Sequence, residues 1–360
     1  MSLEVFLRKG PFAAEEVSFF SGLNKAWLYY SEPYRNLLEQ YAGCQTICFF
    51  LKDEKGNILG AFPLAVSMGK YGKVANSLPY YGSNGSVIFD KNNTAGYMVE
   101  EIISRLTEEV IAWIEKEGCV ASNFVTHPFY PEVSDWFSGN LKFDFKDERI
   151  GQITPLPVEI SNDEALVSLF DDPRPRNIRR ALKAGIKVRK SHDEADMEFL
   201  FRVHKENIES IGGKAKDYRF FESVSKLIPR EMYGVWVAET EGKPIAALLL
   251  FYFNQTIEYF TPATLHEYRN LQPSSLLIFE AMKEGVKSGF TFWNWGGTWK
   301  TQTGVYDFKK KWGAQDFPYE YYCRIYDKSL LNLTATELGD AYPHFYVLPF
   351  SALTQSHEEK

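Results

Sequence analysis

Hydrophobic and polar positions recur in the same order in the two halves of this 360-residue chain. In the first half, "TICFFLKDEKGNILGAFPLAV" places two apolar, β-rich runs around the polar turn Asp53–Asn57, which predicts a β-hairpin. After a loop rich in glycine and tyrosine, apolar residues recur at three- and four-residue spacing from about Ala95 to Lys116, which predicts an amphipathic helix. Gly118 ends this helix, and "CVASNFV" is predicted to be the next strand.

The second half repeats this order. "VWVAETEGKPIAALLLFYF" predicts two strands around the polar turn Glu239–Pro244, and "TIEYFTPAT" predicts a third. A loop then leads into a helix from about Ser274 to Lys287, and "FTFWNW" follows as a strand. Two more helices are expected between residues 170 and 230, in "ADMEFLFRVHKENIESIG" and "DYRFFESVSKLI".

This order of strands, helix and strand favours a mixed α/β (α+β) fold over a doubly wound parallel sheet. We expect two lobes, each a mixed, mostly antiparallel sheet flanked by helices, packed across a cleft. The length exceeds one ordinary domain, and the proline-containing stretch "GQITPLPVEI" marks the boundary. The predicted domains are a first lobe over residues 1–152, a second lobe over residues 153–335, and a partly disordered C-terminal extension over residues 336–360.

Composition and charge narrow the function classes. The net charge of -7 argues against a general nucleic-acid coat but leaves room for a local basic patch. The longest apolar run, Ile245–Phe253, is far shorter than the ~20 residues that a membrane helix needs, and it predicts a strand buried on both faces. Since the N-terminus has no apolar run of signal-peptide length, the chain is expected to be cytoplasmic. The four cysteines, expected to be free and mostly buried, and the histidines show no metal-ligand spacing, so no metal site is expected.

The densest positive charge lies in "RPRNIRRALKAGIKVRK", which holds eight basic residues and no acidic one. On a helix that begins near Pro175, Arg176 and Arg180 share one face. Because arginine binds phosphate through two parallel hydrogen bonds, Arg176, Asn177 and Arg180 are candidates for binding an anionic substrate or RNA. The alternative is a solvated basic helix that pairs with acidic residues elsewhere.

A second candidate is the helix start in "YRNLQPSSLL". Ser274 and Ser275 stand where the helix begins, so backbone N–H groups and hydroxyls there could hold an anion. An ordinary helix cap is the alternative. The nearby "WGGT" lacks the spacing of a dinucleotide or Walker motif.

A third candidate is "TGVYDFKKKWGAQ", where three lysines follow the segment Gly296–Gly304, expected to be a loop beyond a strand end. Phe308 and Trp312 are one helical turn apart and should pack inward. Lys309 lies off that face and is expected to point into the cleft, where it would neutralise donor phosphate or stabilise charge on a carbonyl oxygen. Three lysines that only keep a turn solvated are the alternative. Because aromatic rings offer flat contact area, substrate contacts are expected from residues near this stretch and in the first-half loop: Tyr306, Phe308, Lys310, Tyr80 and Tyr81.

Four ordered segments make the chain resemble a known family. They are "RNIRRALKAGIKV", "VWVAETEGKPIAALLL", "YRNLQPSSLLIFEAMKEGVKSGF" and "WNWGGTWKTQTGVYDFKKKWGA". Over about Arg174–Arg324 they are similar to the second half of the Fem family of peptidoglycan-bridge aminoacyl transferases, and to its FemAB-related relatives of polysaccharide loci. The resemblance implies two acetyltransferase-like (GNAT-like) lobes. It also implies an activated acyl donor, either aminoacyl-tRNA or acyl-CoA, and an amine acceptor on a cell-wall or polysaccharide precursor.

Carried over by position, the resemblance makes Lys309 the catalytic residue. Where the family commonly has Asp before its Gly-Gly pair, this chain has Asn294 and Trp295, so the charge that such an Asp would contribute is in question. The family's donor loop lands on Tyr268, Arg269, Leu271 and Pro273. The residues expected to bind the donor are Arg269, Leu271, Gln272, Ser274 and Ser275.

The sequence shows no nucleophile motif, so we expect an amine to attack the donor carbonyl directly, without a covalent enzyme intermediate. The predicted function is that of an N-acyltransferase that moves an acyl or aminoacyl group from an activated ester or thioester to an amine of a cell-wall or polysaccharide precursor. We expect no tightly bound cofactor, because acyl-CoA or aminoacyl-tRNA is the co-substrate. The expected partners are an anionic glycan-precursor acceptor and, for one of the two donors, tRNA. The alternative is a non-catalytic binding protein of the same fold that holds an anionic sugar, nucleotide or RNA.

Overall fold

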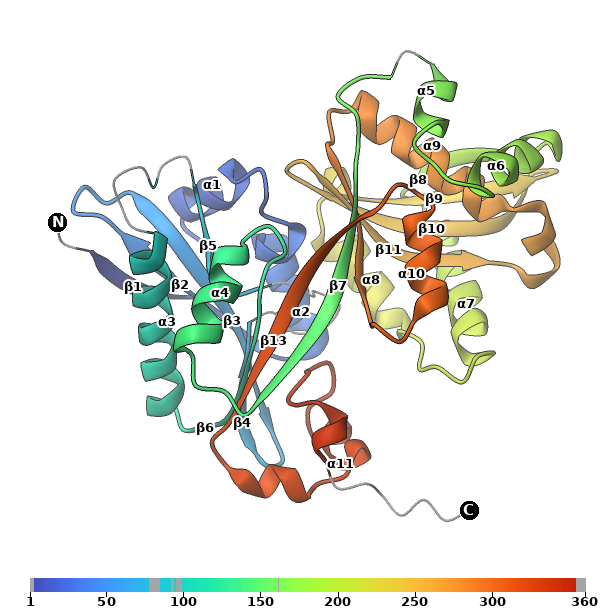
Figure 1. The fold of residues 1–360 in the computed structure, drawn as a ribbon. Helices are drawn as coiled ribbons and strands as arrows, with labels where there is room; N and C mark the ends of the chain where they lie inside the picture. Colours follow the sequence, from blue (N-terminus) through green and yellow to red (C-terminus); the bar gives the residue numbers. More distant parts are fainter. Residues whose placement is uncertain (1–2, 78–84, 92–93, 95–98, 161, 354–360) are drawn as a thin grey trace. The chain divides into compact units, whose positions relative to one another are not determined.

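The computed structural model describes residues 3–77, 85–91, 94, 99–160 and 162–353, and the chain divides into two compact units. Unit 1 comprises Met1–Arg149 and Pro318–Lys360, and unit 2 comprises Ile150–Phe317 (Figure 1). The boundary expected after residue 152 lies close to this division. However, unit 2 ends at Phe317 rather than at residue 335, because the chain then returns to unit 1. Tyr80, Tyr81 and the last seven residues, for which disorder is expected, lie outside the described residues.

Unit 1 is built on a mostly antiparallel sheet. Its strands pair in the order β1-β2-β3-β4-β6-β13, with β5 paired to β3, and the only parallel pair in the described part of this unit is β4 with β6. The predicted hairpin is formed by β2 and β3. The strands are β1 (Glu4–Lys9), β2 (Gln45–Lys52), β3 (Ile58–Gly69), β4 (Gly72–Asn76), β5 (Ile88–Phe89), β6 (Cys119–Val125) and β13 (Gln315–Ile325).

The predicted amphipathic helix of unit 1 is α3, which buries Ile103, Leu106 and Val110 and packs against β2 and β3. The four cysteines are free and buried, and all of them belong to unit 1. The helices of this unit are α1 (Ala14–Gly22), α2 (Glu32–Ala42), α3 (Val99–Lys116), α4 (Pro131–Asn140) and α11 (Ala335–Ala341), with 3-10 turns at η1 (Leu28–Tyr30), η4 (Lys328–Asn332) and η5 (Phe350–Ala352).

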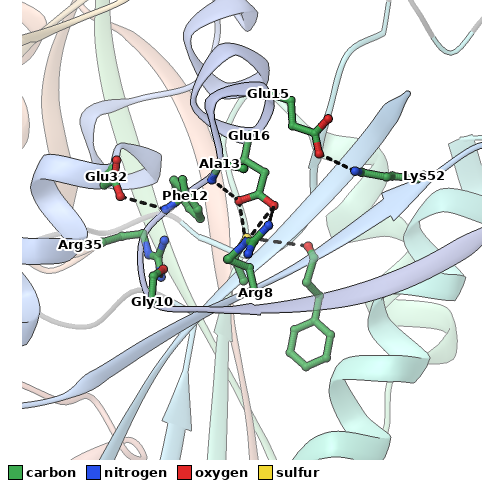
Figure 2. Close-up of polar contacts among 11 residues, drawn as sticks. Arg8, Gly10, Phe12, Ala13, Glu15, Glu16, Glu32, Arg35 and Lys52 are labelled. Atoms are coloured by element: carbon green, nitrogen blue, oxygen red, sulfur yellow. Dashed lines mark hydrogen bonds and ion pairs between the residues drawn. The ribbon is translucent and has the colours of Figure 1, made fainter. Parts of the chain in front are cut away.

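A buried ion pair fixes the first elements of unit 1 (Figure 2). Glu16 of α1 is 0% exposed, and its carboxylate accepts hydrogen bonds from Arg8 Nε and Nη2, at 2.9 and 2.8 Å, and from the Ala13 amide at 2.9 Å. Arg35 of α2 lies over the ring of Phe12, 3.9 Å from its centroid. These charged groups connect β1, α1 and α2 without leaving the Glu16 carboxylate unpaired, as a buried charge requires.

The strands of unit 2 are also mixed in direction. Its strands pair in the order β7-β12-β11-β10-β9-β8, and β11 and β12 run parallel while the other described pairs are antiparallel. The apolar run Ile245–Phe253 lies in β10 between two neighbouring strands and is almost wholly buried, as predicted. The strands are β7 (Phe145–Pro155, in unit 2 from Ile150), β8 (Lys187–Ser191), β9 (Tyr233–Thr240), β10 (Lys243–Phe253), β11 (Thr256–Thr264) and β12 (Phe292–Thr298).

Helices cover both faces of this sheet. Leu248 and Leu250 of β10 share a core with α9, whereas Phe251 contacts Phe260, which stacks on Phe220 of α8. Because side chains alternate along a strand, these two groups lie on opposite faces. The helices are α5 (Asp163–Val167), α6 (Arg174–Lys183), α7 (Glu194–Glu209), α8 (Tyr218–Leu227), α9 (Pro273–Lys287) and α10 (Thr303–Lys310), with 3-10 turns at η2 (Arg230–Met232) and η3 (His266–Leu271).

The two units repeat one succession of elements. Apart from the short strand β5 before α3, unit 1 runs β2, β3, β4, α3, β6, and unit 2 runs β9, β10, β11, α9, β12. β4 pairs in parallel with β6 in unit 1, and β11 pairs in parallel with β12 in unit 2. The expected fold class, a mixed α/β fold with mostly antiparallel strands flanked by helices, is therefore confirmed.

Two segments differ from the sequence-based expectation. Gly151–Pro157 was expected to mark a domain boundary, yet Gly151 to Pro155 continue β7. Gly296 and Gly297 were expected in a loop, but they belong to β12, where Gly297 pairs with Gly151. Both segments pair with a strand that is distant in the sequence, and local hydrophobic periodicity does not reveal such pairing.

Candidate functional site

Lys309, the expected catalytic residue, is buried and only 6% exposed. Its ammonium group donates hydrogen bonds to the carbonyl oxygens of Gly296 and Gly297, at 3.2 and 3.1 Å, and to Oγ1 of Thr298 at 2.8 Å. These three uncharged acceptors match the three N–H groups of a lysine ammonium. Burial without a countercharge among them lowers the pKa of Lys309 to about 8.

The acceptors of Lys309 belong to a bulge in β12. The register of β12 against β7 shifts between Asn294 and Gly297, and Gly296 has a φ of +72°, a left-handed conformation that favours glycine. We call Trp295–Gly297 the β12 bulge. Because a bulge interrupts the hydrogen-bond ladder, the Lys309 ammonium supplies donors where the ladder lacks them.

A further layer of hydrogen bonds lies behind this contact. Thr298 Oγ1 donates to Gln152 Oε1 at 2.8 Å, and Gln152 Nε2 donates to the Tyr306 carbonyl at 3.2 Å. Gln152 therefore connects β7 to both β12 and α10. Sequence reasoning missed this residue, because a single glutamine in a strand gives no local signal of the partners it will meet.

The other residues of the lysine stretch have different environments. Lys310 pairs with Asp316 at 3.5 Å, and the Tyr306 hydroxyl donates to the same carboxylate at 2.6 Å. Phe308 packs against the core and Trp312 is fully buried, as their spacing predicts. Of the three consecutive lysines, Lys309 alone reaches the β12 bulge through a hydrogen bond in the described residues.

The basic segment Arg174–Lys190 contains one buried arginine, Arg174, and several exposed cations. Arg174, at the start of α6, lies over the rings of Phe308 and Trp312, 4.3 and 5.5 Å from their centroids, and donates to the Phe308 carbonyl at 3.3 Å. It therefore attaches α6 to the helix that carries Lys309. The predicted anion-binding residues of α6 are exposed or half-buried: Arg176, which pairs with Asp172 at 3.3 Å, Asn177 and Arg180.

A pocket of about 310 Å³ lies where β11 ends and α9 begins. Three of the predicted donor-binding residues line it, whereas Leu271 packs against the core and Ser275 is buried away from it. The structure thus brings together part of the predicted set. The lining residues are Asn207, Pro262, Ala263, Thr264, Arg269, Gln272, Pro273 and Ser274.

Asn207 of α7 holds the wall of this pocket. Its side chain donates to the Thr264 carbonyl and accepts from the Thr264 amide, both at 3.1 Å. The Thr264 hydroxyl lies 2.5 Å from the Ser274 hydroxyl. Sequence reasoning missed Asn207, since it lies on a helix far from the donor loop in the sequence.

The amide groups at the start of α9 are mostly used within the turn. Gln272 adopts a left-handed φ of +63°, and its amide donates to the Arg269 carbonyl at 3.1 Å. The Ser275 amide donates to the Gln272 carbonyl at 3.1 Å, and Pro273 has no N–H. In this described stretch, only the Ser274 amide has no such acceptor. Arg269, by contrast, is exposed.

The pocket and Lys309 lie at one edge of the unit 2 sheet. β11 ends at Thr264 beside the pocket, and β12 ends at Thr298 beside Lys309. The two strands are parallel, so their carboxyl ends point to the same edge. Ligands of α/β sheets bind beyond the carboxyl ends of strands, which makes this edge the candidate site.

Comparison with known proteins places this geometry in a class. Residues 174–310 match the model of the acetyltransferase (GNAT) domain family. A tandem GNAT protein from the clavulanic acid biosynthesis pathway, solved without AcCoA, has a TM-score of 0.53 at 9% identity, with 89% of this chain and 98% of that chain covered. The chain therefore has a GNAT-like fold, and the segment that matches the GNAT domain model lies in unit 2.

Two relatives within this class are similar to the chain. The crystal structure of FemX has a TM-score of 0.71 to it at 15% identity, with 90% of this chain and 98% of that chain covered. A lipid II:glycine glycyltransferase of Staphylococcus epidermidis is 21% identical over 245 residues, which cover 49% of this chain. The match spans only 58% of that relative's own length. The resemblance expected from the four sequence segments is thus confirmed.

Two features of the wider chain complete the description. Among the described residues, no helix is long and apolar enough to cross a membrane. The same part of the chain contains no group of three or more His, Cys, Asp or Glu side chains that could hold a metal ion.

Proposed function

We propose that the chain transfers an aminoacyl group from an aminoacyl-tRNA to an amine of a peptidoglycan precursor or a related cell-wall precursor. The similar proteins suggest the reaction class, since one is a lipid II:glycine glycyltransferase and another is FemX. The site that supports it is the carboxyl edge of β11 and β12, which has a buried cation beside one strand and a pocket beside the other.

The start of α9 favours aminoacyl-tRNA over acyl-CoA as the donor. A CoA donor brings a pyrophosphate, which helix N-termini hold through free backbone N–H groups. Here Pro273 has none, and the amides of Gln272 and Ser275 are used within the turn. The exposed Arg269 guanidinium lies at the pocket instead. A side-chain cation and one free amide suit the phosphates and ribose ester of a tRNA 3′ end better than a pyrophosphate.

The reaction needs no enzyme nucleophile. The neutral amine of the acceptor attacks the ester carbonyl carbon and forms a C–N bond, while the carbonyl electrons move to oxygen. The C–O bond to the ribose then breaks, the amine loses a proton and the ribose oxygen gains one, so atoms and charge balance. Positioning of the two substrates and stabilisation of the oxyanion supply the acceleration.

We assign the stabilising charge to Lys309. Its ammonium can meet an oxyanion when it releases Oγ1 of Thr298, because Thr298 keeps its hydrogen bond to Gln152. The two bonds to the carbonyls of the β12 bulge stay in place and hold the group. With a pKa of about 8, Lys309 is mostly charged at neutral pH.

The acceptor is assigned to the side of α6. Arg174 attaches this helix to α10, so the exposed cations of α6 belong to the element that packs beside the helix of Lys309. Arginine there would bind the phosphates of a glycan precursor. The proposed acceptor contacts in unit 2 are Arg176, Asn177, Arg180, Tyr306, Phe308 and Lys310.

One observation favours a second candidate function. All three N–H groups of Lys309 are donated to groups of the protein itself, which also suits a lysine that only holds the β12 bulge. In that case unit 2 would be a non-catalytic module, and the pocket at Arg269 would bind an anionic sugar, nucleotide or RNA.

The test is a transfer assay with separate donors. Purified protein is incubated with a panel of charged tRNAs or of acyl-CoAs, together with peptidoglycan precursors, and the acceptor mass is measured. We expect a mass gain with charged tRNA, and Lys309→Met should reduce its rate about 100-fold or more. Lys311→Met is the matched control, because Lys311 is assigned no role.

Transfer from acyl-CoA alone would replace the donor assignment. Binding of tRNA or precursor without any transfer would favour the second candidate. Equal rates in the Lys309→Met and Lys311→Met variants would refute the role of Lys309.

A further inference from the structure

β11 and β12 part directly after one buried pair. Their register runs Thr256 with Phe292, Ile257 with Trp293, and Glu258 with Asn294, and the pairing ends there. Glu258 is 2% exposed and Asn294 is 1% exposed. A carboxylate and an amide thus stand at the point where the strands separate towards the candidate site.

A continuous line of hydrogen bonds leads from this pair to Lys309. Asn294 Nδ2 donates to Glu258 Oε2 at 2.8 Å, and Asn294 Oδ1 accepts from the Gly296 amide at 2.9 Å. The carbonyl of the same Gly296 accepts from Lys309. One residue of the β12 bulge is therefore held through its amide by the Glu258–Asn294 pair and through its carbonyl by Lys309.

We infer that Glu258 is a positioning residue, which through Asn294 fixes the β12 bulge in the conformation that Lys309 binds. Because Oε2 of Glu258 accepts this hydrogen bond, the Asn294 amide nitrogen faces Glu258. The amide oxygen then faces the Gly296 N–H. The influence of the pair on catalysis rests on the proposed acyl transfer, whereas its hold on the bulge does not.

This arrangement also explains why position 294 is Asn in this chain rather than Asp. An Asp at that position would still accept from the Gly296 amide, but it would face the Glu258 carboxylate at hydrogen-bond distance. The N–H group that Asn294 donates to Glu258 would then be lost. The carboxyl group of this pair therefore resides on β11, and the amide on β12 connects it to the bulge.

Exchanging the carboxyl group and the amide between positions 258 and 294 provides a test. Asn294→Asp alone should loosen the bulge, because Asp lacks the N–H group that Asn294 donates to Glu258. Asn294→Asp combined with Glu258→Gln restores one carboxylate and one amide, in which the glutamine donates to the aspartate and the aspartate still accepts from Gly296. Only residues that act on the bulge as a pair give this pattern of loss and rescue.

Amide hydrogen exchange of a peptide that covers the β12 bulge measures the hold directly and needs no substrate. We expect exchange at least about 10-fold faster in Asn294→Asp, and within about 3-fold of the unmodified protein in the double variant. Asn207→Asp with and without Glu258→Gln is the matched control, because Asn207 also bonds through both amide atoms but contacts Thr264. Glu258→Gln should not rescue it.

Transfer kinetics form the second readout. We expect kcat to fall about 10-fold or more in Asn294→Asp with little change in KM, and to recover in the double variant. If the protein transfers nothing, the exchange pattern still tests the hold on the bulge, so the two proposals fail separately. Unchanged exchange in Asn294→Asp would overturn the inference. So would a double variant that stays as loose as the single one or fails to fold.

Discussion

The Lys309 ammonium lies 3.1 Å from the carbonyl oxygen of Gly297 and closes the β12 bulge against α10. A lysine placed in this way is costly to bury as an ion, because its acceptors carry no formal charge. Its pKa is about 8, against 10.5 for an ordinary lysine. Between these two values the unfolded chain holds a proton that the folded chain has lost, so stability rises with pH through this window.

The first prediction concerns this pH dependence. The free energy of unfolding of the unmodified protein, minus that of Lys309→Met, should increase by about 3 kcal/mol between pH 7.5 and 10.5. Urea unfolding of both proteins across this range measures the difference. Lys216, whose pKa is also about 8, is present in both proteins and cancels. Parallel stability curves would mean that Lys309 is not buried as a cation.

The second prediction concerns the donor pocket. Arg269 is exposed at the pocket, and its loss should remove one phosphate contact. Arg269→Gln should weaken binding of charged tRNA about 10-fold and reduce the slope of log affinity against log salt concentration by about 1. Titrations at several salt concentrations measure both quantities. Arg219→Gln, on the exposed side of α8, is the control and should change neither.

The third prediction concerns acid stability of unit 1. His127 is buried against Trp27, with ring centroids 4.3 Å apart, and its Nδ1 accepts from the Phe129 amide. Burial lowers the pKa of His127 to about 3, so the folded chain stays neutral where the unfolded chain takes up a proton. Stability should therefore fall as pH drops below about 6.5.

His127→Asn keeps an acceptor for Phe129 but removes this titration. Its stability should depend less on pH, by about 3 kcal/mol between pH 7 and pH 4. Chemical unfolding at several pH values provides the measurement, and the exposed His266→Asn serves as its control. The hypothesis fails if both variants lose stability with acid as the unmodified protein does.

The fourth prediction compares two neighbouring carboxylates of α1. Glu16 is buried with Arg8 and the Ala13 amide, whereas Glu15 pairs with Lys52 and is more than half exposed. Glu16→Ala should lower the free energy of unfolding by about 2 kcal/mol. Glu15→Ala should change it by less than about 0.5 kcal/mol, because exposed pairs contribute little. Equal effects in urea unfolding would contradict the burial of Glu16.

Hydrophobic periodicity predicted the helices and strands whose own apolar faces pack into the core. The hairpins at β2/β3 and β9/β10 and the helices α3 and α9 follow from apolar spacing and turn residues. The donor loop was also partly predictable, because a helix start with Arg269 and Ser274 is a local pattern. Gln272, also expected to bind the donor, lines the same pocket.

Contacts between distant strands could not be predicted in this way. Glu258 meets Asn294 because β11 and β12 are in register, and Gln152 meets Thr298 because β7 pairs with β12. Register is set by the whole sheet rather than by a local run of residues. Lys309 is a further case, since its acceptors in the β12 bulge depend on the pairing of β12 with β7.

The free cysteines offer a practical consequence. All four lie in unit 1, and burial raises the pKa of Cys44 to about 12 and of Cys119 to about 11, so native thiolate is scarce at neutral pH. Alkylation by iodoacetamide should therefore wait for this unit to open, while unit 2 contributes no thiol signal. The rate of alkylation, measured by mass spectrometry without any engineered label, should therefore report how often unit 1 opens.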